Sequence, residues 1–145
     1  KAAIIGGKHA LAAAQDKIIT AAKEAGIEII GPFWYGGEAS VENIEMLKPK
    51  VADADMIFAV GGGKAIDTCK VLSHSTDRPF FTFPTIASTC ASCTSLGILY
   101  HPDGSLREYS FSKIPPKHLY RHSDNRRRAG QISLGRHRRH DGEAL

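Results

Sequence analysis

A run of three glycines and a lysine in the middle of the chain has the residue types that bind a phosphorylated ligand. It is Gly61-Gly62-Gly63-Lys64, and it lies between an apolar segment and a segment with helical spacing. Glycine lacks a Cβ, so its backbone can approach a ligand closely, and the amides and dipole at the start of a helix attract anions. The run matches neither G-x-G-x-x-G nor the Walker pattern. It predicts a diphosphate site, with a glycine-rich turn that holds no ligand as the alternative.

Hydroxyl and thiol side chains further along the chain form a second candidate group. Thr85, Ser88 and Thr89 could orient a ligand through hydrogen bonds, or could satisfy only the backbone of their own loop. Cys90 and Cys93 form a lone C-x-x-C, which is compatible with a redox pair or with half of a zinc site. Because a second pair of ligands is missing, we expect instead two small buried thiols that line a pocket.

The segments around these residues alternate between apolar runs and helical spacing. We expect strands at residues 2–5, 27–30, 54–60 and 80–83, and helices at residues 9–25, 41–47 and 65–72. This order predicts an α/β fold in which helices flank a parallel sheet, and ligands of such sheets bind where strand ends meet helix starts. Pro102-Asp103-Gly104 separates two further alternating runs, which predicts a β-hairpin after the last parallel strand.

The composition is that of one globular domain. The 145 residues are 42% hydrophobic and 23% charged, which excludes wholesale disorder. No apolar run approaches the ~20 residues of a membrane helix. The chain opens directly on an apolar stretch, so we expect no secretory leader. Three cysteines are too few for a disulfide framework, so we expect a cytoplasmic protein.

The charge is divided unevenly along the chain. Residues 1–112 carry 10 Lys and Arg against 12 Asp and Glu, whereas residues 113–145 carry 9 against 3. We therefore predict a folded domain over residues 1–112 and an irregular basic tail over residues 113–145. Clustered arginines in the tail could neutralise nucleic-acid phosphates, but no aromatic stacking residues accompany them.

Two motifs resemble those of a known enzyme family. Residues 61–70 resemble the G-G-G-[KS]-x-x-D-x-x-K motif of the iron-containing alcohol dehydrogenase superfamily. Residues 84–89 and 95–100 resemble the P-T-x-A-S-T and S-V-I-Y segments of its glycerol dehydrogenase branch. The resemblance covers roughly residues 1–113. It implies a Rossmann-like dinucleotide-binding domain over residues 1–112, with NAD or NADP as cofactor.

The resemblance also implies which residues form the site. The run at residues 61–64 would hold the diphosphate, and the hydroxyls would line the remaining cofactor. The implied cofactor-binding set is Gly7, Gly61, Gly62, Gly63, Lys64, Asp67, Thr85, Ser88, Thr89, Thr94 and Leu96. Asp67 could instead form only an i,i+3 ion pair with Lys70. Cys90 stands where many glycerol dehydrogenases have an aspartate, so it is the candidate residue of the substrate pocket.

One departure from the family leaves the choice of cofactor open. NAD-preferring relatives often carry an acidic residue just after the first strand, where this chain has Gly6-Gly7-Lys8. A lysine at a helix start opposes the helix dipole, and the 2′-phosphate of NADP could compensate it. A solvated Lys8 with no ligand is the alternative.

The implied activity is hydride transfer between NAD(P) and an alcohol or polyol. In the family a divalent metal, zinc or iron, polarises the alcohol oxygen, and a helical second domain holds it. Residues 1–145 lack that domain, so we expect no metal ligands and no turnover from this chain alone. We expect a homo-oligomer for a full-length protein, and neither nucleic acid nor membrane as a partner. Alternatives are a glycerol-1-phosphate dehydrogenase or a dehydroquinate synthase-like enzyme, and a non-enzymatic module that binds nucleic acid through the tail.

The tail has an explanation other than nucleic-acid binding. Family members have a strand, an aspartate, a helix and a metal-binding G-I-G-D segment at this point. Codons permitted for residues 118–142 can encode such a segment when reading begins at the second base. We therefore hypothesise that the residues after about Ile114 are read in a shifted frame, and that the tail histidines are not metal ligands. Resequencing several independent clones tests this, and an unchanged tail would exclude it.

Overall fold

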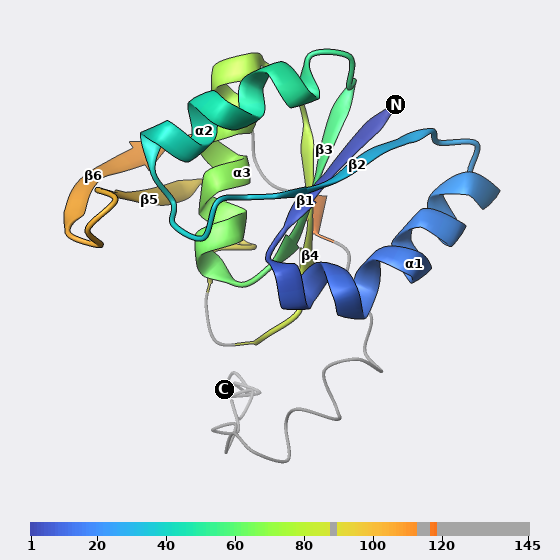
Figure 1. Cartoon of the computed structure of the whole chain (residues 1–145), viewed down its shortest axis with the longest axis horizontal. Helices are drawn as coiled ribbons and strands as arrows, with labels where there is room; N and C mark the ends of the chain where they lie inside the picture. Colours follow the sequence, from blue (N-terminus) through green and yellow to red (C-terminus); the bar gives the residue numbers. More distant parts are fainter. Residues whose placement is uncertain (88–89, 113–116, 119–145) are drawn as a thin grey trace, which may run out of the picture.

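A computed structural model describes residues 1–87, 90–112 and 117–118 of the chain. These residues form a parallel sheet with helices on both faces and a separate antiparallel hairpin (Figure 1). In chain order the elements are β1 (Ala2–Gly6), α1 (Lys8–Glu24), β2 (Ile29–Trp34), α2 (Val41–Leu47), the 3-10 turn η1 (Lys48–Val51), β3 (Met56–Gly61), α3 (Gly63–Thr76), β4 (Phe80–Pro84), β5 (Leu96–Tyr100), β6 (Leu106–Phe111) and β7 (Lys117–His118). The predicted α/β class and the hairpin are confirmed.

The order of the strands places a crevice between β1 and β3. The described strands lie in the order β2-β1-β3-β4-β7, and every neighbouring pair is parallel. The chain leaves β1 for β2 on one side and then returns to build β3 on the other. The connections that follow β1 and β3 therefore diverge, which is the arrangement that opens a ligand crevice at the carboxyl ends of the two strands.

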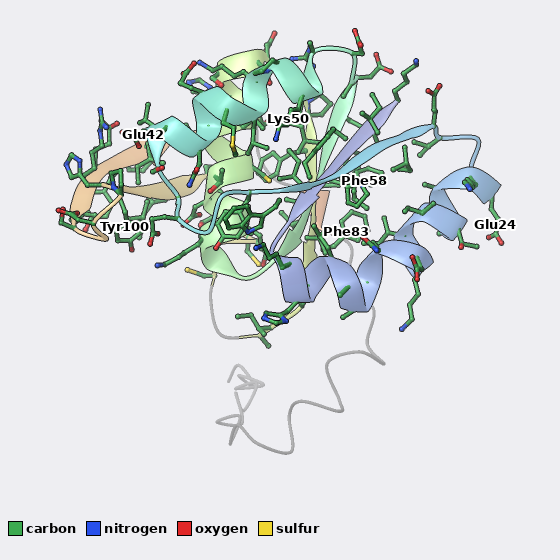
Figure 2. All side chains as sticks on the ribbon, in the orientation of Figure 1. Glu24, Glu42, Lys50, Phe58, Phe83 and Tyr100 are labelled. Atoms are coloured by element: carbon green, nitrogen blue, oxygen red, sulfur yellow. The ribbon has the colours of Figure 1, made fainter. Side chains whose placement is uncertain are left out.

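Alternate strand residues build two cores, one on each face of the sheet. Ile5, Ile57 and their neighbours pack beneath α2 and α3. On the opposite face Ile4, Phe58 and Val60 pack beneath α1. Figure 2 shows Phe58 and Phe83 on that face, with ring centroids 5.2 Å apart. Both faces of β1 and most of β3 are buried, as expected for strands covered on both sides.

Some element boundaries differ from those predicted. The second strand runs over Ile29–Trp34 instead of residues 27–30, so Gly31 and Pro32 lie inside it. Among the described strands β2 is an edge, where a proline that lacks an N–H is tolerated. The sheet also extends into the predicted tail, because β7 pairs with β4. The rest of the tail lies outside the described residues.

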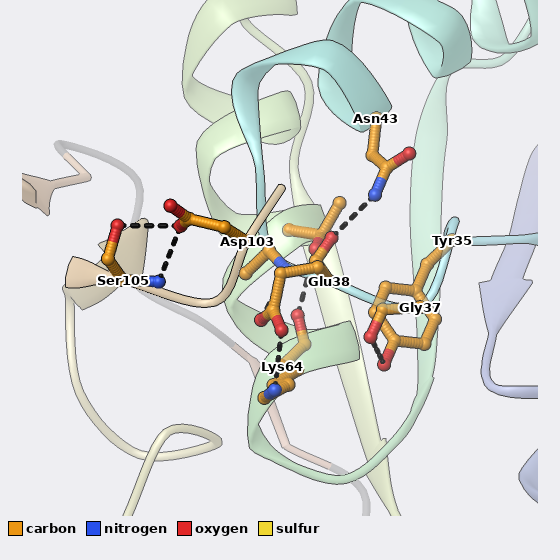
Figure 3. Close-up of polar contacts among 9 residues, drawn as sticks. Tyr35, Gly37, Glu38, Asn43, Lys64, Asp103 and Ser105 are labelled. Carbon is orange, nitrogen blue, oxygen red and sulfur yellow. Dashed lines mark hydrogen bonds and ion pairs between the residues drawn. The ribbon is translucent and has the colours of Figure 1, made fainter. Parts of the chain in front are cut away.

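Local side-chain contacts explain the start of α2 and the turn of the hairpin. Ser40 caps α2, since its Oγ accepts a hydrogen bond from the Asn43 amide at 3.3 Å. In the hairpin turn, an Asp103 carboxylate oxygen accepts hydrogen bonds from the amide and the hydroxyl of Ser105 (Figure 3).

None of the helices in the described ranges has the length and hydrophobicity needed to cross a bilayer.

Candidate functional site

A cleft of about 490 Å³ lies at the carboxyl ends of β1 and β3. Its volume is in the range of small-molecule and cofactor sites. The residues that line it are Gly7, Lys8, His9, Ala10, Trp34, Tyr35, Gly37, Gly61, Gly62, Gly63, Lys64, Ala65, Thr85 and Ile86. They come from the start of α1, the end of β2, the start of α3 and the residues after β4. The cleft is therefore at the crevice that the strand order creates.

Two helices begin at this cleft without a side-chain cap. The N-cap of α1 is Gly7 and that of α3 is Gly62, and neither helix has an acidic residue in its first turn. The first amides of a helix have no partner within it, and the helix dipole makes that end positive. Both helix starts therefore favour an anion in the cleft.

The glycines at the cleft serve different purposes. A Cβ on Gly6 would come within 2.3 Å of the Val60 carbonyl oxygen, so Gly6 permits close packing of the sheet. Gly61 has φ +145°, a conformation that a side chain disfavours. Gly62 has an ordinary extended backbone, and its Cβ would meet only the side chain of Ile86, at 2.8 Å. Gly62 thus keeps space open at the cleft rather than relieving backbone strain.

Two lysines bring positive charge to the cleft. The Lys8 ammonium lies 4.4 Å from the centroid of the Trp34 ring. The Lys64 ammonium lies 2.6 Å from a Glu38 carboxylate oxygen (Figure 3). It also lies 5.6 Å from the centroid of the Tyr100 ring. The hydrogen bond that the ammonium donates to Glu38 raises the pKa of Lys64 above its ordinary value. Lys64 is therefore charged at neutral pH, and a carboxylate already binds it.

Asp67 lies in a buried ion pair rather than on the cleft wall. Its carboxylate is 3.0 Å from the Lys70 ammonium, and the Lys70 side chain is completely buried. The same ammonium donates a hydrogen bond to the Leu96 carbonyl, which ties α3 to β5. Burial raises the pKa of Asp67, and the charge of Lys70 opposes that effect.

The structure brings together only part of the predicted cofactor set. The members that line the cleft are Gly7, Gly61, Gly62, Gly63, Lys64 and Thr85. Asp67, Thr94 and Leu96 are not among its lining residues; the Thr94 hydroxyl contacts the Leu96 carbonyl at 3.5 Å. Ser88 and Thr89 lie outside the described residues.

Two aromatic residues that line the cleft, Trp34 and Tyr35, are not in the set predicted from the sequence. Trp34 and Tyr35 follow from the longer β2, because a strand that ended at Ile30 would not carry them to the site. Burial raises the pKa of Tyr35, and the charge of Glu38 adds to this effect. The one signal in the sequence was the Gly36-Gly37 pair, which marks a turn directly after the strand.

The expectation of two buried thiols is wrong. Cys90 and Cys93 are both exposed, and Cys90 is not among the residues that line the cleft. The Cys93 amide donates to the Cys90 carbonyl at 2.9 Å, so the two cysteines flank a surface turn. Cys69 is the buried thiol, on the inner face of α3, and burial raises its pKa well above the ordinary value. A thiol with a raised pKa is unreactive near neutral pH.

We predict that a thiol reagent distinguishes these cysteines. In the native chain a chromogenic disulfide reagent should modify Cys90 and Cys93, because both are exposed, and should leave Cys69 unmodified. Cys69 should react only after denaturation. The release of two chromophore equivalents before unfolding and a third afterwards checks the prediction. Three equivalents from the native chain would contradict the burial of Cys69.

Comparison with known proteins gives the family. The family model described as iron-containing alcohol dehydrogenase matches residues 1–119. The chain belongs to this family. The resemblance found at residues 61–70 is thereby confirmed, and the match extends past Ser112 over the two residues of β7.

Several dehydrogenases are similar over most of this chain. A glycerol dehydrogenase from Escherichia coli is 38% identical over 109 residues, which are 73% of this chain and 29% of that protein. Hydroxycarboxylate dehydrogenase A from the same species is 36% identical over 110 residues, 75% of this chain and 30% of that protein. The crystal structure of glycerol dehydrogenase from Schizosaccharomyces pombe has a TM-score of 0.71 and 31% identity, over 81% of this chain and 30% of that one. The chain thus spans less than a third of these relatives.

Proposed function

We propose that this chain binds the diphosphate of NAD or NADP in the cleft between β1 and β3. The observation that carries the proposal is that two uncapped helix starts, at Gly7 and Gly62, line a single cleft of cofactor size. A diphosphate there would accept hydrogen bonds from first-turn amides and lie at the positive ends of two helix dipoles. Membership of the iron-containing alcohol dehydrogenase family supports the same ligand.

The side chains around the cleft have distinct proposed roles. Gly62 leaves room for the diphosphate, and Lys64 supplies a cation beside it. Thr85 lines the cleft directly after β4, and its hydroxyl is proposed to form a hydrogen bond with the cofactor. Trp34 and Tyr35 offer aromatic surface for the apolar part of the ligand.

For the full-length protein we propose NAD(P)-dependent oxidation of an alcohol or polyol, or the reverse reduction. Bound NAD(P) would supply hydride chemistry, and the residues described here would hold and orient it. Among the described residues no cluster of three or more His, Cys, Asp and Glu is placed to hold a metal. The described part of the chain therefore offers no set of ligands for the family's zinc or iron.

We propose that the full-length protein is a cytoplasmic homo-oligomer with a small alcohol as its substrate. We also propose that the reading frame changes between about Ile114 and the end of the family match at residue 119. The arginine-rich residues beyond that point then have no role in binding.

Titration of the chain with NADH and NADPH, followed by dinucleotide fluorescence, tests the proposal and the choice of cofactor. Lys8 is exposed beside the N-cap of α1, with no carboxylate among the residues that line the cleft. If Lys8 binds a 2′-phosphate, Lys8→Gln should weaken NADPH binding about tenfold and leave NADH binding unchanged. Equal effects on both ligands would assign Lys8 no part in the choice, and no binding of either would overturn the proposal.

A further inference from the structure

The cation expected to hold the diphosphate already has an anionic partner. The ammonium of Lys64 is 2.6 Å from Glu38 Oε2, although the two residues are separated by the whole of α2 and β3. The Lys64 side chain is 54% exposed and that of Glu38 only 20%. Figure 3 shows the carboxylate of Glu38 directed at the ammonium of Lys64 at the start of α3. The pair therefore lies at the edge of the proposed diphosphate site.

The Glu38 carboxylate and the loop that carries it are held in place by several hydrogen bonds. The second oxygen of Glu38 accepts a hydrogen bond from the Ala39 amide at 3.1 Å. The backbone carbonyl of Glu38 accepts one from the Asn43 side chain at 2.8 Å (Figure 3). The next residue is bound in turn, since the Tyr100 amide donates to the Ala39 carbonyl at 2.8 Å. These contacts join the Glu38 loop to both α2 and β5.

Lys64, in contrast, can move. Its ammonium is at the end of a flexible four-carbon stem, and more than half of the side chain is exposed. Gly36 and Gly37 shape the loop with positive φ, and a Cβ on Gly36 would overlap the Asn43 side chain, so the loop has little room to shift. When an anion enters the cleft, Lys64 is thus the partner that can turn toward it.

A diphosphate and Glu38 are both anions that need the same cation. The first amides of α3 attract the diphosphate, but its charge would be close to that of the Glu38 carboxylate. Like charges at such separations repel, and the energy of the Lys64 ion pair must be given up or shared. The pair should therefore lower the affinity for a dinucleotide below the value that the cleft alone would allow.

We propose that Glu38 is a positioning residue that competes with the cofactor diphosphate for Lys64, so that Lys64 exchanges one anion for the other on binding. This inference rests on the proposed function of the cleft. It assigns to Glu38 control over cofactor affinity, exerted through Lys64 and not through contact with the reacting atoms. The competition also keeps the Lys64 charge paired whether the cleft is empty or filled.

The test compares dinucleotide affinities of Glu38 variants, with NADH as the probe and ADP as a second, simpler diphosphate. Glu38→Gln keeps an oxygen that can accept from the Ala39 amide but removes the charge. It should bind both probes about threefold to tenfold more tightly than the unmodified chain. Glu38→Asp keeps the charge and should restore the lower affinity. Glu42→Gln, which removes an exposed carboxylate at the start of α2, is the matched control and should change affinity less than twofold.

A double-mutant cycle separates competition from a structural role. Lys64→Met should weaken dinucleotide binding about tenfold. In the Lys64→Met background, the gain in affinity caused by Glu38→Gln should be smaller than in the unmodified chain. Thermal denaturation without ligand should differ little between the chain and Glu38→Gln, so a gain seen only with ligand identifies competition. Unchanged or weaker binding by Glu38→Gln would overturn the inference. Failure of the unmodified chain to bind NADH would instead overturn the proposed function.

Discussion

Replacing Lys70 with methionine should lower the free energy of unfolding by about 3–5 kcal/mol at neutral pH, the cost of removing one partner of a buried ion pair. The Lys70 side chain is completely buried, and that of Asp67 is 11% exposed. Without the ammonium, the Asp67 carboxylate would have no cation at 3.0 Å, and the Leu96 carbonyl would keep only the longer contact from the Thr94 hydroxyl among its side-chain donors. Chemical denaturation followed by circular dichroism measures the change.

The effect of Lys70→Met should depend on pH in a defined direction. Burial already raises the pKa of Asp67, and loss of Lys70 would raise it further, because the opposing charge is gone. Below the ordinary pKa of an aspartate, near 4, Asp67 is protonated in both the folded and unfolded chain, so its contribution to the deficit disappears. As the pH rises above that value, the unfolded chain ionises first, so the deficit should grow until the pH passes the raised pKa of the folded chain. A deficit that shrinks with rising pH would contradict this assignment.

Two variants make the result interpretable. Asp67→Asn combined with Lys70→Met removes both charges and should recover part of the lost stability, even if the single variant fails to fold. Lys23→Met removes an exposed lysine in the last turn of α1 and should change stability by about 0.5 kcal/mol or less. If Lys70→Met were as stable as Lys23→Met, the buried pair would contribute nothing to the fold.

Replacing Gly62 with valine should weaken dinucleotide binding by about a hundredfold or more, equivalent to losing two hydrogen bonds to a charged group. The backbone of Gly62 is extended, so a valine there creates no backbone strain. Its side chain would instead press on Ile86, at the wall of the cleft, and occupy space that a diphosphate needs. Far-UV circular dichroism should remain near that of the unmodified chain while NADH binding is lost.

The matched control adds the same side chain elsewhere. Ala12→Val places a valine on the exposed surface of α1 and should leave NADH affinity unchanged. Gly61 is unsuitable for this comparison, because its positive φ would strain the fold on substitution. Unchanged affinity in Gly62→Val would mean that the glycine run is only a turn. The proposed cofactor site would then lose the contact on which it depends.

The parts of the site that could be predicted from the sequence are those encoded by adjacent residues. The glycine run, the lysine after it and the helix that follows lie together in the chain, so their geometry is local. The N-cap at Ser40 is predictable for the same reason, since the donor is the amide of Asn43, three residues away. Helix and strand periodicity likewise reports burial on one face or both, without knowledge of the partner element.

Contacts between distant residues were not predictable in this way. Glu38 and Lys64 carry no motif that joins them, and the pair exists only because the loop after β2 crosses the start of α3. Cys90 and Cys93 have the residue type of buried positions but lie on a turn that leaves them exposed. Residue type predicts average burial, whereas the path of a loop sets the actual value.

The sequence by itself determined the α/β class, the glycine run and the family to which the chain belongs, because each depends on residue types at short spacing. The tertiary structure alone decided that β1 and β3 are neighbours and that two helix starts therefore share a cleft. Strand order arises from backbone hydrogen bonds that any residue can make, so it is not written in the side chains of any one segment. The aromatic residues of the cleft and the competing carboxylate follow from that order, whereas the Asp67–Lys70 pair is local to α3 and only its burial depends on the tertiary structure.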